Sequence, residues 1–343
     1  MRKLQHLFLS CLAGLLLSGL TIAAEVPLNP NHPDRYTVVK GDTLWDISSL
    51  FLQDPWRWSD IWYVNPQIAN PHLIYPGDVL VLTYVNGQPR LSLQPGTLRL
   101  SPRVKSYPLD DAIPTIPISA IDPFLRKPLV VEDGELENLP YIVAFADEHM
   151  MGGAGQRMYV RNLDETESPK YHVVRKSGPY QDADTGEVLG FEALDIAETV
   201  IQRLGDPATA LLLTTEQEVL TGDHLVKLNE NPMTSFQPKA PDTEINGSII
   251  DIIDGLVQAA QFNIVAIDKG NREGLKPGDV LTIMHKGETI KDQVTPDPSD
   301  TIKLPDEEAG LLMIFRTFDR VSFAIILRST RAIHIFDRVV NPQ

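Results

Sequence analysis

An apolar run opens the chain. Residues 7–20 are mostly hydrophobic, with Arg2 and Lys3 before them and small residues at 21–24 after them. This order of charged, apolar and small segments predicts a secretory signal peptide over residues 1–24, followed by cleavage. The run is shorter than the roughly 20 residues of a membrane-spanning helix. We therefore expect export of a mature chain, with a retained anchor helix as the alternative.

Over residues 35–84 the spacing of apolar positions predicts a compact module. A proline at 66 ends the second of its helices, because the residue before a proline disfavours helical geometry. Pro76-Gly77 suits a type II turn before the last strand. The expected elements are a strand at 36–39, a helix over 44–51, a helix over 58–64 and a strand at 79–82 that pairs with the first.

Prolines and short β-type runs divide the rest of the chain. Residues 85–139 contain repeated prolines with isoleucines between them, which predicts an extended connector packed on a neighbouring domain. Two β-rich domains are expected at 140–228 and 245–343, joined by a proline-containing linker at 229–244. One helical pattern covers 194–204. The predicted fold class is therefore α+β, with a small β-α-α-β module followed by mainly-β domains.

The two β-rich domains share a pattern. Residues 208–223 and 322–337 align without a gap as strand, turn, strand and a closing aspartate, although few residues are identical. Either the domains are distant copies of each other, or two unrelated hairpins have the same periodicity. The sequence leaves both explanations open.

Composition and charge restrict the chemistry. The chain has 30 Lys and Arg against 46 Asp and Glu, a formal net charge of −16, so nucleic acid is not an expected partner. The only cysteine, Cys11, falls inside the predicted signal peptide, which excludes disulfides and thiolate zinc sites from the mature chain. The eight histidines are scattered without HExxH or a close pair, and no Gly-x-Ser-x-Gly is present. We predict no catalytic residues, no metal site and no cofactor.

The module over residues 35–84 resembles a LysM domain. The resemblance rests on an opening Gly-Asp-Thr-Leu-x-x-Ile at 41–47 and a closing Pro-Gly-Asp at 76–78, in the order typical of that family. It implies a β-α-α-β fold that binds N-acetylglucosamine-containing glycans, in bacteria chiefly peptidoglycan. The chain departs from the family in a tryptophan-rich stretch at 52–58, where most LysM domains have a short polar turn between the helices.

A glycan-binding groove follows from the resemblance. In LysM domains the groove lies between the loop after the first strand and the loop before the last. A mostly uncharged glycan needs backbone N–H and C=O groups held in a rigid, shallow groove, with a few apolar contacts. The residues so implied are Gly41, Asp42, Thr43 and Leu44 in the first loop, and Asn70, Pro71, His72, Leu73 and Ile74 in the second.

Two groups of residues in the module have structural alternatives. Thr43 and Asp46 lie three residues apart and can form a capping box at the start of the helix instead of contacting a sugar. The tryptophans can stack on sugars or fill the core; they are Trp45, Trp56, Trp58 and Trp62.

The whole mature chain is similar to a bacterial family that joins a signal peptide and one LysM domain to a C-terminal region like the flagellar assembly protein T. This family includes the secretin-associated protein of type IV pili. The similarity lies in short turn-and-strand stretches at 185–192, 205–208, 221–223, 274–281, 315–322 and 333–340. Phe336 stands where the family pattern has glycine, a departure expected to tighten the last turn.

The second resemblance implies a periplasmic, non-enzymatic adaptor. Such a protein binds peptidoglycan, anchors an outer-membrane secretin of a type IV pilus machine to the cell wall and can assemble into a homo-oligomeric ring. A flagellar basal-body component is a variant of the same role. The alternative from a different class is a cell-wall hydrolase, or a regulator of one, that the LysM domain targets to its substrate.

Overall fold

The computed structural model describes the chain in segments. They are residues 26–62, 74–94, 113–127, 130–163, 169–227, 236–253, 257–292, 294–295 and 300–342. Contacts divide the chain into two compact units: one holds Met1–Asp42 and Asp46–Ile113, and the other holds Thr43–Trp45 and Pro114–Gln343. The predicted signal peptide lies outside the described segments. No helix within these segments is long and apolar enough to cross a membrane.

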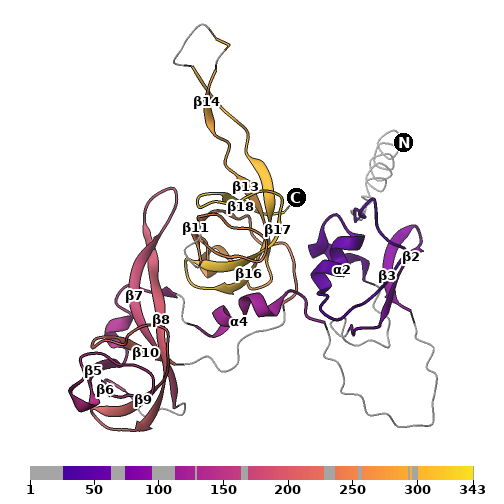
Figure 1. The fold of residues 1–343 in the computed structure, drawn as a ribbon. Helices are drawn as coiled ribbons and strands as arrows, with labels where there is room; N and C mark the ends of the chain where they lie inside the picture. Colours follow the sequence, from indigo (N-terminus) through magenta and orange to yellow (C-terminus); the bar gives the residue numbers. More distant parts are fainter. Residues whose placement is uncertain are drawn as a thin grey trace, which may run out of the picture. The chain divides into compact units, whose positions relative to one another are not determined.

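A small three-stranded antiparallel sheet and short helices form the amino-terminal part of the described chain (Figure 1). Its elements are β1 (Arg35–Thr37), α2 (Leu44–Phe51), η2 (Pro55–Arg57), α3 (Trp58–Ile61), β2 (Val79–Val85) and β3 (Gln88–Leu93). β2 is the central strand, with Tyr36 of β1 and Leu93 of β3 both paired with Leu80. The predicted β-α-α-β order is confirmed. β3 adds an end strand from residues expected to be connector.

Helix α2 forms because its apolar positions share one face. Leu44, Ile47 and Phe51 are each at most 3% exposed, as their helical spacing predicts. The helix begins at Leu44, so Thr43 occupies the position just before it, where a capping residue lies.

Most of the tryptophans belong to the core. Trp45, Trp58 and Trp62 are buried, whereas Trp56 is partly exposed. The rings of Trp58 and Trp62 meet edge to face, with 6.1 Å between their centroids. Burial removes three of the four indoles from any sugar-stacking surface, so the core explanation holds for them.

In its described residues, the second unit contains two six-stranded β-barrels. The first barrel consists of β5 (Tyr141–Phe145), β6 (Arg157–Arg161), β7 (Lys170–Gln181), β8 (Val188–Arg203), β9 (Ala208–Thr215) and β10 (His224–Lys227). These strands lie in the order β8-β7-β10-β5-β6-β9, and an additional pairing of β9 with β8 closes the ring. The short strand β4 (Val130–Val131) pairs with the outer part of β8.

The second barrel consists of β11 (Asn246–Ile252), β12 (Ile264–Ile267), β13 (Val280–His285), β16 (Glu307–Thr317), β17 (Ser322–Ser329) and β18 (Arg338–Val340). Its ring has the order β11-β12-β17-β16-β13-β18. When the strands of each barrel are numbered along the chain, both rings have the order first, second, fifth, fourth, third, sixth. The aligned stretches 208–223 and 322–337 each cover the fifth strand and the turn before the sixth. The shared topology supports the explanation that the two domains are copies.

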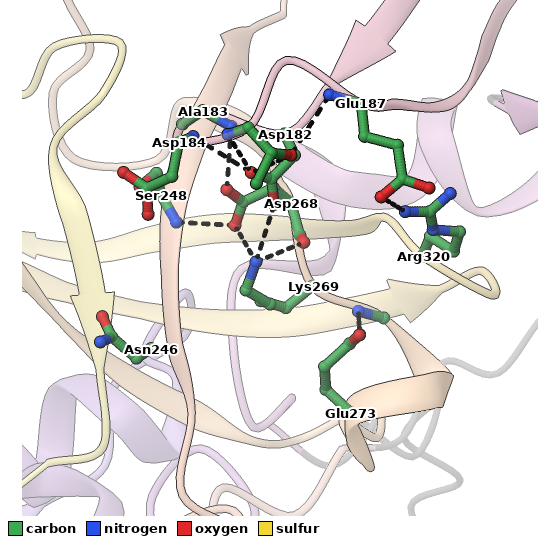
Figure 2. Close-up of polar contacts among 12 residues, drawn as sticks. Asp182, Ala183, Asp184, Glu187, Asn246, Ser248, Asp268, Lys269, Glu273 and Arg320 are labelled. Atoms are coloured by element: carbon green, nitrogen blue, oxygen red, sulfur yellow. Dashed lines mark hydrogen bonds and ion pairs between the residues drawn. The ribbon is translucent and has the colours of Figure 1, made fainter.

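In both barrels the hairpin between the third and fourth strands extends beyond the ring. In the second barrel, β14 (Thr289–Lys291) pairs with β15 (Thr301–Lys303) in a long arm (Figure 1). In the first barrel, the turn between β7 and β8 contacts the second barrel (Figure 2). Nζ of Lys269 lies 3.3 Å from Oδ2 of Asp182 and 3.2 Å from Oδ1 of Asp268. Arg320 pairs with Glu187 at 2.7 Å, so charged contacts join the two barrels.

The helix predicted over residues 194–204 is wrong, because residues 194–203 belong to strand β8. β8 pairs with β7 on one side and β9 on the other, and the register shifts along both pairings. Such bulges break the strict alternation of a strand. Ala193, Ile196 and Ala197 are all buried, a spacing that matches the period of a helix. The irregular strand therefore imitates a helical pattern.

The stretch expected to be an extended connector also contains a helix, α4 (Ile118–Arg126). Arg316 of β16 donates hydrogen bonds to the carbonyl oxygen of Phe124, at 2.9 Å, and to that of Lys127. Burial lowers the pKa of Arg316 to about 10. The guanidinium thus satisfies carbonyl groups that a helix end leaves without intrahelical partners, and it fixes α4 against the second barrel.

Candidate glycan-binding site

The loop after β1 is held in shape by the Asp42 carboxylate. Gly41 has a φ of +101°, which glycine adopts without strain. Oδ2 of Asp42 accepts hydrogen bonds from the backbone N–H of Val39, at 2.8 Å, and from the hydroxyl of Tyr36, at 3.0 Å. Burial and the hydrogen bond to Asp42 raise the pKa of Tyr36. This oxygen of Asp42 is therefore already used within the loop.

The loop before β2 has the same construction. Gly77 has a φ of +97°, and Oδ2 of Asp78 accepts the backbone N–H of Tyr75 at 2.9 Å. Two backbone hydrogen bonds join this loop to the loop after β1. Val38 donates its N–H to the Asp78 carbonyl, and Gly77 donates its N–H to the Val38 carbonyl, each at 2.8 Å. The described end of this loop is therefore fixed against Val38, the residue that follows β1.

Three of the predicted side chains lie in the interior. Thr43, Leu44 and Ile74 are 4%, 3% and 1% exposed, whereas Gly41 is exposed and Asp42 is partly exposed. In the described part of the site, Gly41 and the partly exposed Asp42 are what a ligand can reach. The predicted residues outside the described segments are Asn70, Pro71, His72 and Leu73.

Residues further along the chain hydrogen-bond to backbone groups of both predicted loops. Within the first unit, Ile113 donates its N–H to the carbonyl oxygen of Ile74 at 2.8 Å. Within the second unit, Leu44 donates its N–H to the carbonyl oxygen of Pro114 at 2.9 Å. Two of the predicted site residues, Leu44 and Ile74, therefore each have a backbone group paired with this chain's own backbone. Sequence reasoning misses this pairing because no local pattern links a loop to a distant residue.

Comparison with known proteins identifies the module. The chain shares 43% identity over 58 residues with a protein of Bacillus subtilis (strain 168) described as "Uncharacterized protein YqbP". The match covers 14% of this chain and 26% of that protein, so the chain spans only a small part of this relative. The family model of the LysM domain matches residues 36–83. Residues 36–83 are thus a LysM domain, a module that binds peptidoglycan or chitin-type glycans.

Proposed function

We propose that this protein is an exported, non-enzymatic adaptor of the periplasm that binds peptidoglycan through residues 36–83 and a protein partner through its second unit. The observation that carries the proposal is the LysM domain, joined in one chain to a pair of β-barrels. One shallow groove that recognises uncharged sugar groups gives modest affinity. A ring of several copies would add these weak contacts by avidity.

The proposed partner is an outer-membrane secretin of a type IV pilus machine. The similarity of the turn-and-strand stretches to the pilus-associated family supports this choice. The arm formed by β14 and β15 offers a suitable contact surface, because Ile290 and Ile302 are 42% and 46% exposed on it. A two-stranded arm also has free strand edges, to which a partner strand can pair.

Binding to isolated peptidoglycan sacculi tests the wall-binding part. The chain without residues 1–24 should sediment with sacculi and release no soluble muropeptides. A variant that also lacks residues 26–94 should remain in the supernatant; this deletion includes β3, which completes the sheet. Release of muropeptides by the chain without residues 1–24 would instead support the wall-hydrolase alternative.

Co-purification tests the partner. The tagged chain, isolated from detergent-solubilised cell envelope, should bring down a secretin, and the variant without residues 26–94 should do so equally well. Retention on sacculi without any secretin would refute the pilus role and leave the glycan-binding role intact.

A further inference from the structure

A buried carboxylate lies in the turn before β18 of the second barrel. Asp337 is 2% exposed. Its Oδ2 accepts the backbone N–H of His334 at 2.8 Å, and its Oδ1 lies 2.9 Å from Nδ1 of His285. The strand register explains the second contact: Met284 of β13 pairs with Arg338 of β18, so the next residue, His285, lies beside Asp337. Residues distant in sequence thereby form a cluster that no sequence spacing indicates.

The first barrel shows how the equivalent carboxylate is neutralised. Asp223 precedes the sixth strand there and is 3% exposed. Its two oxygens accept hydrogen bonds from Arg175 of the third strand, each at 2.8 Å. Asp337 occupies the same place in the second barrel, but its ion-pair partners among the described residues are histidines. The guanidinium of one barrel is thus replaced by two imidazoles in the other.

One of these imidazoles has an unsatisfied nitrogen. Nδ1 of His334 is buried and makes no hydrogen bond to the described residues. It lies 4.0 Å from Oδ2 of Asp337, too far for a hydrogen bond. The rings of His334 and His285 are 5.5 Å apart between centroids, at 51°. One nitrogen of each ring and one carboxylate oxygen lie within 4.8 Å of one another.

We propose that His285, His334 and Asp337 bind a zinc ion. A tetrahedral zinc with bonds of about 2.0–2.1 Å places its ligand atoms about 3.4 Å apart and two imidazole centroids about 5 Å apart. The separations in the cluster lie close to these values. Two imidazoles with one carboxylate favour zinc over calcium or magnesium, which prefer oxygen ligands. The His285 and His334 side chains are 30% and 38% exposed, which leaves water as the fourth ligand.

In the second barrel, the ion would have the structural role that Arg175 has in the first barrel. It supplies the positive charge that the buried carboxylate of Asp337 needs, and it joins β13 to the turn before β18. Glu307 lies opposite His285 on β16. Because its carboxylate pairs with Arg331 at 2.6 Å, Glu307 is not included among the ligands. The site is separate from the LysM domain, so it does not depend on the proposed function.

Isothermal titration of the chain without residues 1–24 with zinc chloride tests the site. We expect one ion per chain. His334→Ala should weaken binding at least tenfold, and it removes no side-chain hydrogen bond that holds the turn. His149→Ala, which changes an exposed histidine of the first barrel region, should bind zinc like the unchanged protein. Circular dichroism of both variants establishes that each is folded.

A second measurement separates a built site from loose binding to an acidic surface. Cobalt(II) in place of zinc should give the visible absorption of tetrahedral coordination in the unchanged protein and in His149→Ala, but not in His334→Ala. Equal zinc affinity in both variants, or the absence of tetrahedral cobalt in the unchanged protein, would overturn the proposal.

Discussion

At the scale of single residues, one turn design recurs throughout the molecule. An Asp or Asn side chain accepts the backbone N–H three residues before it, at 2.8–2.9 Å, and the residue just before it has a positive φ. The side chains that accept these bonds are Asp42, Asp78, Asp223, Asn263, Asp279 and Asp337. Four of these turns have glycine before the acceptor, and two have Phe262 or Phe336. The turn at Phe336 therefore has the same construction as the glycine turns, and the expectation of a tighter turn is wrong.

The exposed ring of Phe336 leads to a prediction about strain. Phe336 has a φ of +72° and is 56% exposed, so it gains little burial to offset a left-handed backbone. We expect the free energy of unfolding of Phe336→Gly to be about 1 kcal/mol higher than that of Phe336→Ala, because only glycine adopts this conformation without steric cost. Urea denaturation followed by far-ultraviolet circular dichroism measures the difference. Equal stability of the two variants would show that position 336 is not strained.

Asp182, in the turn between β7 and β8, makes stability depend on pH (Figure 2). The backbone N–H of Thr185, with smaller contributions from the Thr185 hydroxyl and Lys269, lowers the pKa of Asp182 from 3.8 to about 2. A pKa lower in the folded state than in the unfolded state means that the carboxylate stabilises the fold above pH 3.8, and that this stabilisation is lost as the pH falls toward 2.

Asp182→Asn should therefore be less stable than the unchanged protein at pH 7, and the difference should shrink as the pH falls from about 4 to about 2. Denaturation curves at several pH values measure it. Asp184→Asn is a matched control in the same turn, since the Asp184 side chain is 69% exposed. A stability difference that stays constant down to pH 2 would contradict the role of the Asp182 charge.

At the scale of elements, the sequence predicts the helices and strand pairs whose deciding residues lie close together along the chain. The start of α2 and the pairing of β1 with β2 follow from apolar spacing and from turn residues close in sequence. The sequence fails where distant contacts decide the outcome. β8 has register shifts along its pairings with both β7 and β9, and α4 is fixed by Arg316, which comes much later in the chain. No local spacing brings His285 next to His334, since β13 and β18 must pair first.

The backbone pairing of Leu44 with Pro114 gives a prediction about glycan affinity. If residues 41–44 contact the sugar as the resemblance implies, a glycan competes with this pairing for the Leu44 N–H. Replacing residues 113–116 by Gly-Ser-Gly-Ser removes the buried side chains of Ile113 and Ile116, which hold the segment in place. It should then increase the affinity for tetra-N-acetylchitotetraose, measured by calorimetry, whereas Pro114→Ala keeps both isoleucines and should leave the affinity unchanged. Unchanged or weaker binding after the replacement would show that the segment does not compete.

At the scale of the whole molecule, the repeated barrel could be suspected from the sequence but not established. The aligned stretches 208–223 and 322–337 cover only one strand and one turn of each barrel. The stronger argument is the common strand order, and it depends on pairings such as β11 with β18, which join the two ends of a domain. Such pairings are set by tertiary structure and have no signature in a single sequence. The two barrels differ in the side chains that contact their buried aspartates, Arg175 in the first and His285 in the second.

The division into two units predicts two separately stabilised parts. Three of the four tryptophans, Trp56, Trp58 and Trp62, lie in the first unit, so tryptophan fluorescence mainly follows the LysM domain, whereas the strands of the barrels dominate the circular dichroism. A ligand that binds only the folded state raises the unfolding temperature of the part that holds it. On heating, tetra-N-acetylchitotetraose should raise the midpoint seen by fluorescence alone, and zinc the midpoint seen by circular dichroism alone. The zinc effect should vanish in His334→Ala. One ligand that shifted both midpoints equally would show that the chain unfolds as a single cooperative body, because independent units cannot share the binding energy of one site.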